Sequence, residues 1–330
     1  MAARSGDPQR ATGTGQGRGA APSGASDSGA AAPGLAAAEP RTAGSAAADF
    51  AALVAEAAAA PVEGWDFSWL AGRATEERPS WGYARLIADR LARADTALDL
   101  DTGGGEVLAE APALPPRMAA TESWPPNLAR AAARLGPRGV AVVATGEGAP
   151  LPFADAVFDL VVSRHPVATP WEEVARVLRP GGAFLSQQVG PASVFELTEF
   201  FLGPQPPETR ARRHPDHARA AAEATGLEVV DLRMERLRMR FHDVGAVVYF
   251  LRKVIWIVPG FDADRYRDRL RELHERIRAE GAFTAHSTRF LIEARRPRSA
   301  APHPPTGGRL DRDRPQVPIM GETDRGALRR

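Results

Sequence analysis

The sequence predicts an α/β fold in which a parallel sheet carries helices on both of its faces. Short apolar runs alternate along the chain with segments in which apolar residues lie three and four positions apart. One of these apolar runs leads directly into a glycine cluster and then into a helix. A doubly wound parallel sheet produces this alternation, and its ligands bind beyond the carboxyl ends of its strands.

Seven apolar runs are predicted as strands, and helices are predicted around them. The strands are Ala97–Leu100, Arg117–Thr121, Val140–Ala144, Phe158–Val162, Ala183–Gln188, Leu227–Leu232 and Phe290–Ala294. Three of the helices are Ala84–Arg93, Leu128–Leu135 and Trp171–Leu178.

Two more helices are predicted between the sixth and seventh strands. Val244–Val258 follows the helical period, with Asp243 as its N-cap and Pro259-Gly260 as its stop. A second amphipathic pattern runs from Tyr266 to Gly281. Residues 244–281 are therefore predicted as a helical insertion, which either encloses a substrate as a lid or merely closes the edge of the sheet.

Composition divides the chain into one domain and two tails. Residues 1–46 are rich in Gly, Ala, Ser and Pro, and residues 299–330 carry clusters of Pro, Arg and Asp. Both tails are predicted to be disordered, because they cannot bury enough apolar surface to offset the entropy of ordering. Residues 47–298 remain as a single domain that begins with a helical leader.

Charge and composition limit the partners and the compartment. Lys plus Arg number 42 against 41 for Asp plus Glu, so no global field favours nucleic acid or a membrane surface. The chain has no cysteine, which excludes disulfides, thiol nucleophiles and zinc thiolate sites. It has no secretory signal and no apolar stretch near the roughly 20 residues of a membrane span. We therefore expect a cytoplasmic protein with no membrane partner.

The glycine cluster that follows Leu100 is the strongest functional signal. It reads Asp101-Thr102-Gly103-Gly104-Gly105-Glu106, and glycines let the backbone turn sharply and approach a ligand without interference from Cβ atoms. A simple tight loop has the same composition, so the turn is not specific by itself. The next strand ends at Glu122, where a carboxylate can accept both hydroxyls of a ribose. The third strand is followed by Glu147, four residues before Leu151-Pro152-Phe153.

Taken in order, these motifs resemble the class I S-adenosylmethionine-dependent methyltransferases over about residues 60 to 297. The resemblance implies a seven-stranded Rossmann-like sheet, transferase activity and S-adenosyl-L-methionine as the cofactor. In that family the glycine turn holds the methionine part, the acid that ends the second strand binds the ribose, and the later acid contacts the adenine amine. The cofactor residues implied here are Asp99, Asp101, Thr102, Gly103, Gly104, Gly105, Glu122, Glu147, Leu151 and Ser163.

One position departs from the family pattern. Asp101 stands where the first glycine of Gly-x-Gly-x-Gly is expected. Since a buried carboxylate needs hydrogen bonds or a counter-charge, Asp101 is expected either to meet backbone donors and the cofactor ammonium or to weaken cofactor binding.

The main alternative of similar architecture is a nicotinamide enzyme, which also uses a glycine turn and a strand-end acid. The spacing argues against it, because the third glycine expected in that fingerprint falls on Leu108. An acid ahead of Leu-Pro-Phe also has no role in that fold.

The candidate acceptor pocket combines leader aromatics with residues that follow the fourth strand and precede the seventh. Its predicted members are Trp65, Trp81, Tyr83, Arg164 and Tyr249. Aromatic faces attract a sulfonium cation, so the leader rings are predicted either to wall the pocket or simply to pack the leader on the sheet.

Ser163-Arg164-His165-Pro166 follows the fourth strand, beside the expected position of the methyl group. Methyltransferases that act on exocyclic base amines or glutamine amines often carry Asn-Pro-Pro-Tyr here, and its absence disfavours those acceptors. His165 is the candidate catalytic general base, because the pKa of histidine is near neutral; a structural histidine is the alternative.

Basic residues alternate with apolar ones over 236–242, the spacing of a strand with one basic face. If that face pointed into the site, it would favour an anionic acceptor; otherwise it is solvated. No cluster has metal-ligand spacing, so no metal is expected.

The sequence thus predicts an enzyme that transfers a methyl group from S-adenosylmethionine to a small-molecule acceptor of unknown identity. Two alternatives stay open: a methyltransferase acting on ribosomal or transfer RNA, and a protein that binds the cofactor without catalysis.

Overall fold

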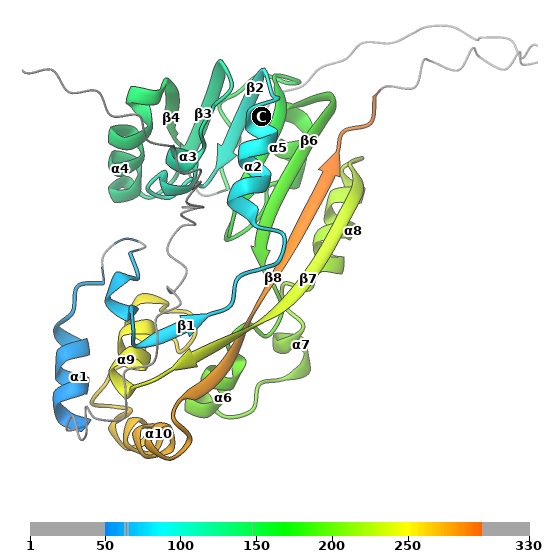
Figure 1. Ribbon diagram of the computed structural model, residues 1–330. Helices are drawn as coiled ribbons and strands as arrows, with labels where there is room; N and C mark the ends of the chain where they lie inside the picture. The colour runs from blue at the N-terminus through cyan, green and yellow to red at the C-terminus, as the bar shows by residue number, and fades with distance from the viewer. Residues whose placement is uncertain (1–49, 63, 65, 147, 299–330) are drawn as a thin grey trace, which may run out of the picture.

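The computed structural model describes residues 50–62, 64, 66–146 and 148–298, which contain one eight-stranded sheet and its flanking helices (Figure 1). The strands are β1 (Ala74–Glu76), β2 (Thr96–Leu100), β3 (Arg117–Glu122), β4 (Val140–Ala144), β5 (Phe158–Arg164), β6 (Leu178–Val189), β7 (Glu228–Phe241) and β8 (Phe283–Arg295). The α-helices are α1 (Phe50–Ala59), α2 (Tyr83–Leu91), α3 (Glu106–Glu110), α4 (Pro125–Leu135), α5 (Trp171–Val177), α6 (Phe195–Leu202), α7 (Pro207–Arg210), α8 (Pro215–Ala224), α9 (Val244–Lys253) and α10 (Arg267–Glu280). Two short 3₁₀ helices are Ser68–Leu70 and Gly136–Arg138.

The predicted fold class is confirmed, with one more strand in the described residues than the seven predicted. The strand order is β1-β7-β8-β6-β5-β2-β3-β4. The extra strand, β1, pairs antiparallel with the end of β7, Ala74 opposite Phe241. The two segments predicted separately around 227–232 and 236–242 form the single strand β7. The predicted tails, residues 1–46 and 299–330, lie outside the described residues.

The central strands place the candidate site at one edge of the sheet. Strand β2 runs parallel to β3 and β5, and β5 runs parallel to β6. Strand β8 is antiparallel to both β6 and β7. Because parallel strands point the same way, the carboxyl ends of β2, β3 and β5 meet at a common edge, where ligands bind in open α/β sheets.

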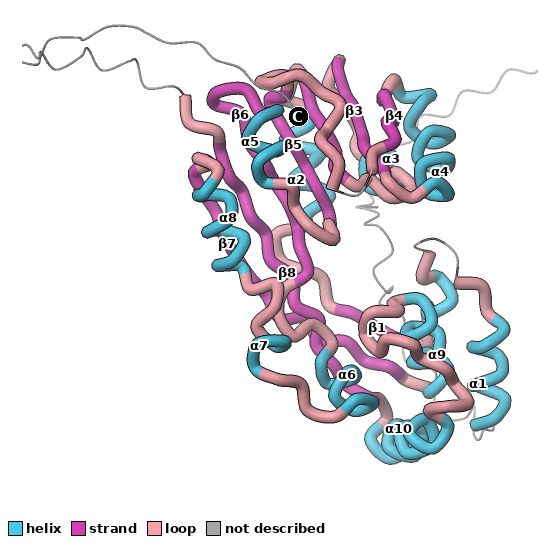
Figure 2. The backbone as a smooth tube through the Cα atoms, turned by 180° about the vertical axis from the view of Figure 1, so that it is seen from behind, coloured by secondary structure: helices cyan, strands magenta, loops and turns pink. Residues whose placement is uncertain are grey.

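Helices cover both faces of these central strands, as the periodicity predicts. Helices α2, α3 and α4 bury Leu91, Leu108 and Leu135 against one face. Helices α5 and α8 bury Val174 and Ala222 against the other face. Figure 2 shows the backbone of these two helices from behind. All five residues of β2 are buried, which is the pattern of a strand covered on both faces.

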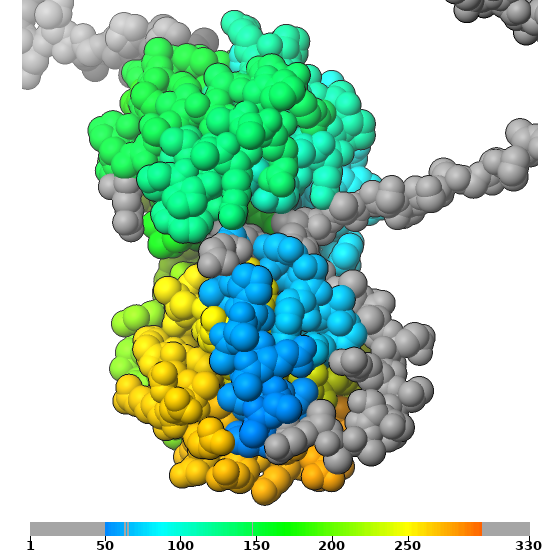
Figure 3. Space-filling view, turned by 90° about the vertical axis from the view of Figure 1, so that its left-hand side faces the viewer, coloured from blue at the N-terminus to red at the C-terminus, as the bar shows by residue number. Residues whose placement is uncertain are grey.

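The long strands β7 and β8 extend beyond the parallel strands into a second lobe. This second lobe contains β1 and helices α1, α6, α9 and α10, which lie below the central sheet in Figure 1. The space-filling view shows the two lobes one above the other (Figure 3). The predicted leader and the predicted insertion, far apart in sequence, are thus parts of the same lobe. No helix among the described residues is long and apolar enough to cross a membrane.

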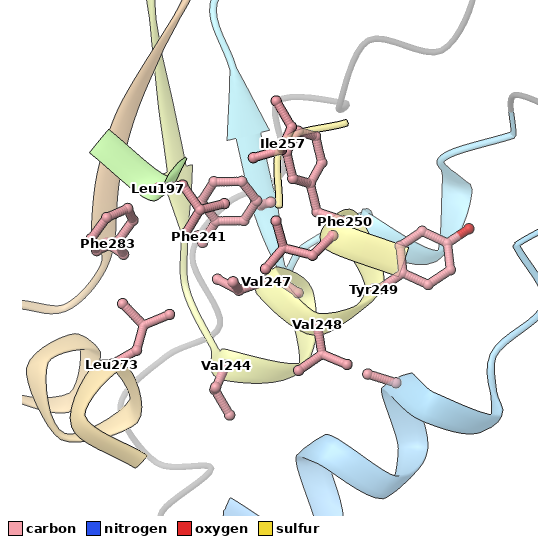
Figure 4. Packing of buried hydrophobic residues seen from close by; sticks show 14 of the residues in the cluster. Leu197, Phe241, Val244, Val247, Val248, Tyr249, Phe250, Ile257, Leu273 and Phe283 are labelled. Atoms are coloured by element: carbon pink, nitrogen blue, oxygen red, sulfur yellow. The ribbon is translucent and has the colours of Figure 1, made fainter. Parts of the chain in front are cut away.

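The second lobe has its own apolar core, centred on α9 (Figure 4). Nine residues of α9 are buried, and Asp243 caps the helix by accepting the Ala246 N–H at 2.7 Å. At Gly245 a Cβ would lie 2.9 Å from the carbonyl oxygen of Leu53, so glycine allows α9 to pack closely on α1. Helix α9 is therefore a core helix of this lobe, and the lid function of residues 244–281 stays a prediction.

We expect Leu273→Ala to lower the free energy of unfolding by about 2–5 kcal/mol, because it removes a fully buried side chain from this core and leaves a cavity. Glu275 lies on the same helix, α10, and is exposed, so Glu275→Ala is the matched control and should change stability by less than about 0.5 kcal/mol. Urea denaturation measures both. Equal effects of the two substitutions would contradict the assignment of Leu273 to the core.

Candidate cofactor and acceptor site

The turn after β2 adopts left-handed backbone conformations at three positions. The φ angles are +54° at Asp101, +64° at Gly103 and +78° at Gly105. The Thr102 N–H donates to the carbonyl oxygen of Thr121 at 2.9 Å, which fastens the turn to the end of β3. Left-handed φ favours glycine, and aspartate is among the few other residues that tolerate it. This explains how Asp101 can replace the first glycine of the expected pattern.

The other glycines of the turn pack against neighbouring elements. A Cβ on Gly105 would lie 2.8 Å from Cδ1 of Leu135 on α4. The Gly104 carbonyl accepts a hydrogen bond from Arg134, which also pairs with Glu106 at 2.6 Å. The close packing of the turn against α4 is thus a reason for small residues here that is independent of any ligand.

Three carboxylates gather around the turn, those of Asp99, Asp101 and Glu122. Burial, together with the neighbouring charges of Asp101 and Glu122, raises the pKa of Asp99 to about 7, against the lowering effect of the Thr102 hydrogen bond. Desolvation and the charge of Glu122 also raise the pKa of Asp101. Asp101 is nevertheless an exposed residue, and its expected contact with the cofactor ammonium stays a prediction. Such a cluster favours a positively charged ligand.

Glu122 is held at the carboxyl end of β3. Its side chain is 5% exposed, and Oε1 accepts the N–H groups of Ser123 at 3.0 Å and Trp124 at 2.9 Å. These two bonds fix the carboxylate, and Oε2 has no hydrogen bond within the described residues. Trp124, half exposed beside it, is an aromatic neighbour that the motif search overlooked, although it stands two residues after the strand-end acid.

The segment around Leu151 is clamped onto α5. Leu151 is 8% exposed and belongs to the apolar core, and its N–H donates to Oε2 of Glu173 at 2.6 Å. Arg176 donates to the carbonyl oxygens of Phe153 at 2.7 Å and Leu151 at 3.0 Å. Glu147, the predicted adenine contact, lies outside the described residues.

Ser163 stands beside the turn, at the end of β5. It pairs in register with Leu100, and its buried Oγ has no hydrogen-bond partner among the described residues. Its carbonyl oxygen accepts the Tyr83 hydroxyl at 2.7 Å. Burial raises the pKa of Tyr83 well above its ordinary value, so the phenol stays neutral and remains a donor.

A hydrogen-bonded chain determines the tautomer of His165. The Trp81 indole N–H donates to Oε1 of Gln187 at 2.8 Å, and Nε2 of Gln187 lies 3.0 Å from Nε2 of His165. Since an indole only donates, the Gln187 amide nitrogen must donate to His165, whose own proton is then on Nδ1. Gln187, which sequence reasoning missed, therefore occupies the lone pair of His165.

This arrangement counts against the expectation that His165 is a general base. Burial lowers the pKa of His165 well below 6.5, and the charges of Arg164, Arg289 and Arg213 lower it further. A base whose lone pair is already engaged and whose pKa lies far below neutrality is poorly suited to accept a proton. Neutral His165 is instead suited to donate from Nδ1.

The structure does not bring the predicted pocket aromatics together. Trp81 and Tyr83 are 5% and 6% exposed and pack in the core beneath α2, which fits the packing alternative. Tyr249 lies in the core of the second lobe, where it stacks on Trp69 at 4.7 Å and its hydroxyl donates to the Asp66 carbonyl at 3.2 Å. Trp65 lies outside the described residues.

The predicted basic face of 236–242 is largely neutralised. Arg236 pairs with Glu196 at 2.7 Å, and Arg238 pairs with Glu77 at 2.8 Å, both on exposed side chains. Exposed pairs of this kind are typical of a solvated strand face.

The residues at the strand ends fit S-adenosylmethionine. The cofactor carries a sulfonium and an ammonium group, which match the clustered carboxylates of Asp99 and Asp101. Oε2 of Glu122 can accept from a ribose, and the Gly103 backbone presents no Cβ. The buried Oγ of Ser163 supplies an unused polar group at the same edge.

Comparison with known proteins gave one family match. Residues 98–186 match the family model described as a methyltransferase domain, and this segment runs from β2 into β6. A comparison with curated proteins found no significant match.

Solved structures with similar folds share little sequence with this chain. A candidate methyltransferase of Bacillus halodurans is 17% identical, with a TM-score of 0.48, and the match covers 66% of this chain and 99% of that one. The YcgJ protein of Bacillus subtilis is 17% identical, with a TM-score of 0.46, and the match covers 65% of this chain and 97% of that one. A geranyl diphosphate methyltransferase in complex with GPP and sinefungin is 15% identical, with a TM-score of 0.40, and the match covers 66% of this chain and 78% of that one. At these TM-scores, no residue role is transferred from them.

Proposed function

We propose that the class I methyltransferase domain that includes residues 98–186 makes this chain an enzyme that transfers a methyl group from S-adenosylmethionine to a small molecule. The observation that carries this proposal is the meeting of the left-handed glycine turn with the carboxylates of Asp99 and Glu122 at the carboxyl ends of β2 and β3. A cytoplasmic location is part of the same proposal.

The chain's own residues would bind and orient the reactants. When bound, S-adenosylmethionine supplies an activated methyl group on a sulfonium sulfur. Glu122 would bind the ribose, Asp99 the ammonium group, and the backbone of the turn the methionine part. Because the methyl group is already activated, the protein contributes mainly by aligning the acceptor and excluding water.

Calorimetry followed by a turnover assay tests the proposal. Purified full-length protein should bind S-adenosylmethionine and, when a broad metabolite extract is added, should produce S-adenosylhomocysteine above the level seen with the extract alone. Cofactor binding without product formation would contradict the proposed enzymatic activity and would support a protein that binds the cofactor without catalysis. If product forms only with added RNA, and binding of that RNA falls steeply with salt, the small-molecule acceptor is wrong.

A further inference from the structure

The tip of β5 carries an arginine that has no ion-pair partner in the part of the chain that the structure describes. Two other arginines close to the central strands are paired: Arg90 of α2 lies 2.8 Å from Glu293, and Arg289 of β8 lies 3.0 Å from Glu76. Within the described residues, the guanidinium of Arg164 forms neither an ion pair nor a hydrogen bond, although the group is largely desolvated. Burial lowers the pKa of Arg164, which nevertheless remains charged at neutral pH because the ordinary pKa of arginine lies far above neutrality. An unpaired, desolvated cation is costly unless a ligand supplies the opposite charge.

Its position is at the edge where the candidate cofactor residues meet. Asp99 pairs in register with Val162, and Arg164 lies two residues further along β5. Side chains two apart in a strand share a face, so Arg164 and Asp99 lie on the same face of the sheet. The titratable groups that face Arg164 are the neutral phenol of Tyr83, the guanidinium of Arg289 and the carboxyl groups of Glu76, Glu110 and Asp99.

More positive charge lies next to Arg164, on the side of His165. The charges of Arg289 and Arg213 both act on His165 together with that of Arg164. Glu76 offsets Arg289, whereas Arg213 has no ion pair in the part of the chain that the structure describes. The Nδ1–H of neutral His165 adds a hydrogen-bond donor with no partner there. Donors and cations at one strand tip are the requirements of an anion site.

We propose that the methyl acceptor carries a carboxylate or phosphate group, which the Arg164 guanidinium binds at the tip of β5 with the Nδ1–H of His165 as a second donor. This inference rests on the proposed function and names its substrate class. We assign the anion to the acceptor because the cofactor's amino-acid end is a zwitterion that would be held by the glycine turn and Asp99. The further positive charge of Arg213 acts on His165, the residue that follows Arg164. His165 is then a binding residue and not a base.

Titration with simple anions tests this site without knowing the acceptor. The protein is saturated with S-adenosylhomocysteine, and inorganic phosphate or malonate is titrated by calorimetry. We expect the wild type to bind at least one of them with a Kd on the order of millimolar, and Arg164→Gln to weaken that binding at least about tenfold, as for loss of a charged hydrogen bond. Arg164→Lys, which keeps the charge but loses the planar fork, should retain part of the affinity.

Controls separate a local effect from a change of net charge. Arg240 is exposed on β7, and Arg240→Gln changes the net charge equally, so its anion affinity should match the wild type. Arg164 has no partner to leave unsatisfied, so Arg164→Gln should melt no lower than the wild type. Anion binding that is absent from the wild type, or unchanged in Arg164→Gln, would overturn the inference.

Binding of S-adenosylhomocysteine distinguishes the two possible sources of the anion. If Arg164→Gln keeps its affinity for S-adenosylhomocysteine within about threefold, the guanidinium serves the acceptor. If that affinity falls more than about tenfold, Arg164 binds the cofactor's own carboxylate, and the acceptor assignment is wrong. A wild type that does not bind S-adenosylhomocysteine at all would contradict the proposed function itself.

Discussion

Cofactor affinity is expected to rise by up to about tenfold per pH unit between about pH 5.5 and pH 7, and to level off above that range. The reason is Asp99, whose pKa burial raises to about 7. S-adenosylmethionine is cationic and should bind the ionised carboxylate, so below pH 7 binding must release the Asp99 proton. Calorimetry in two buffers with different ionisation enthalpies measures both the affinity and the released proton.

Asp99→Asn is the control for this dependence. The amide cannot ionise, so the variant should bind the cofactor weakly, release no proton and show a flat affinity over the same pH range. A wild type whose affinity is independent of pH would show that Asp99 does not face the cofactor.

The raised pKa of Asp99 also predicts how the stability of the ligand-free protein depends on pH. Because the folded state keeps the Asp99 proton up to about pH 7 while the unfolded chain loses it near pH 4, the unfolding free energy should fall as pH rises between these values. The Asp99 contribution is at most roughly 4 kcal/mol and should vanish in Asp99→Asn. Urea melts across this range measure it without any ligand.

Glu122→Ala is expected to weaken cofactor binding about 100-fold, because hydrogen bonds from ribose hydroxyls to a charged, buried carboxylate contribute about 1.5–3 kcal/mol each. Glu122 is already held in place by the N–H groups of Ser123 and Trp124, so it meets the ligand without reorganising. Calorimetry with S-adenosylhomocysteine measures the loss.

Two further variants make the result specific. Glu122→Gln keeps the shape and an acceptor oxygen, so it should lose less affinity than the alanine variant. Glu172 is an exposed acid on α5, and Glu172→Ala should leave affinity unchanged. Because Glu122→Ala also removes the acceptor for two backbone N–H groups, its melting temperature must be measured beside it. A folded Glu122→Ala protein with wild-type affinity would mean that the ribose binds elsewhere.

Local patterns predicted the central sheet well. The strand Val140–Ala144 was predicted with its observed bounds, and the helix Trp171–Leu178 ends within one residue of α5. Hydrophobic periodicity predicts such elements because the residues that determine them are neighbours in sequence. The same reasoning missed β1, whose three residues pair with Met239–Phe241 and show no alternation of their own.

The sequence patterns did not predict the second lobe, for a similar reason. Helices α1 and α9 were assigned separately to a leader and an insertion, and only their packing makes one core. His165 is the clearest case at the site. Its tautomer depends on Trp81 and Gln187. Its low pKa depends first on burial and then on the charges of its neighbour Arg164 and of the distant Arg289 and Arg213.

By itself, the sequence determined the order of the strands along the chain, the glycine turn after Leu100 and the acid at the end of β3, because these features depend on residues adjacent in the chain. Only the tertiary structure decided that the pKa of Asp99 rises to about 7, that His165 is a neutral donor and that the guanidinium of Arg164 has no ion pair among the described residues. Burial and electrostatic fields set those properties, and both are sums over groups that folding brings together from distant positions.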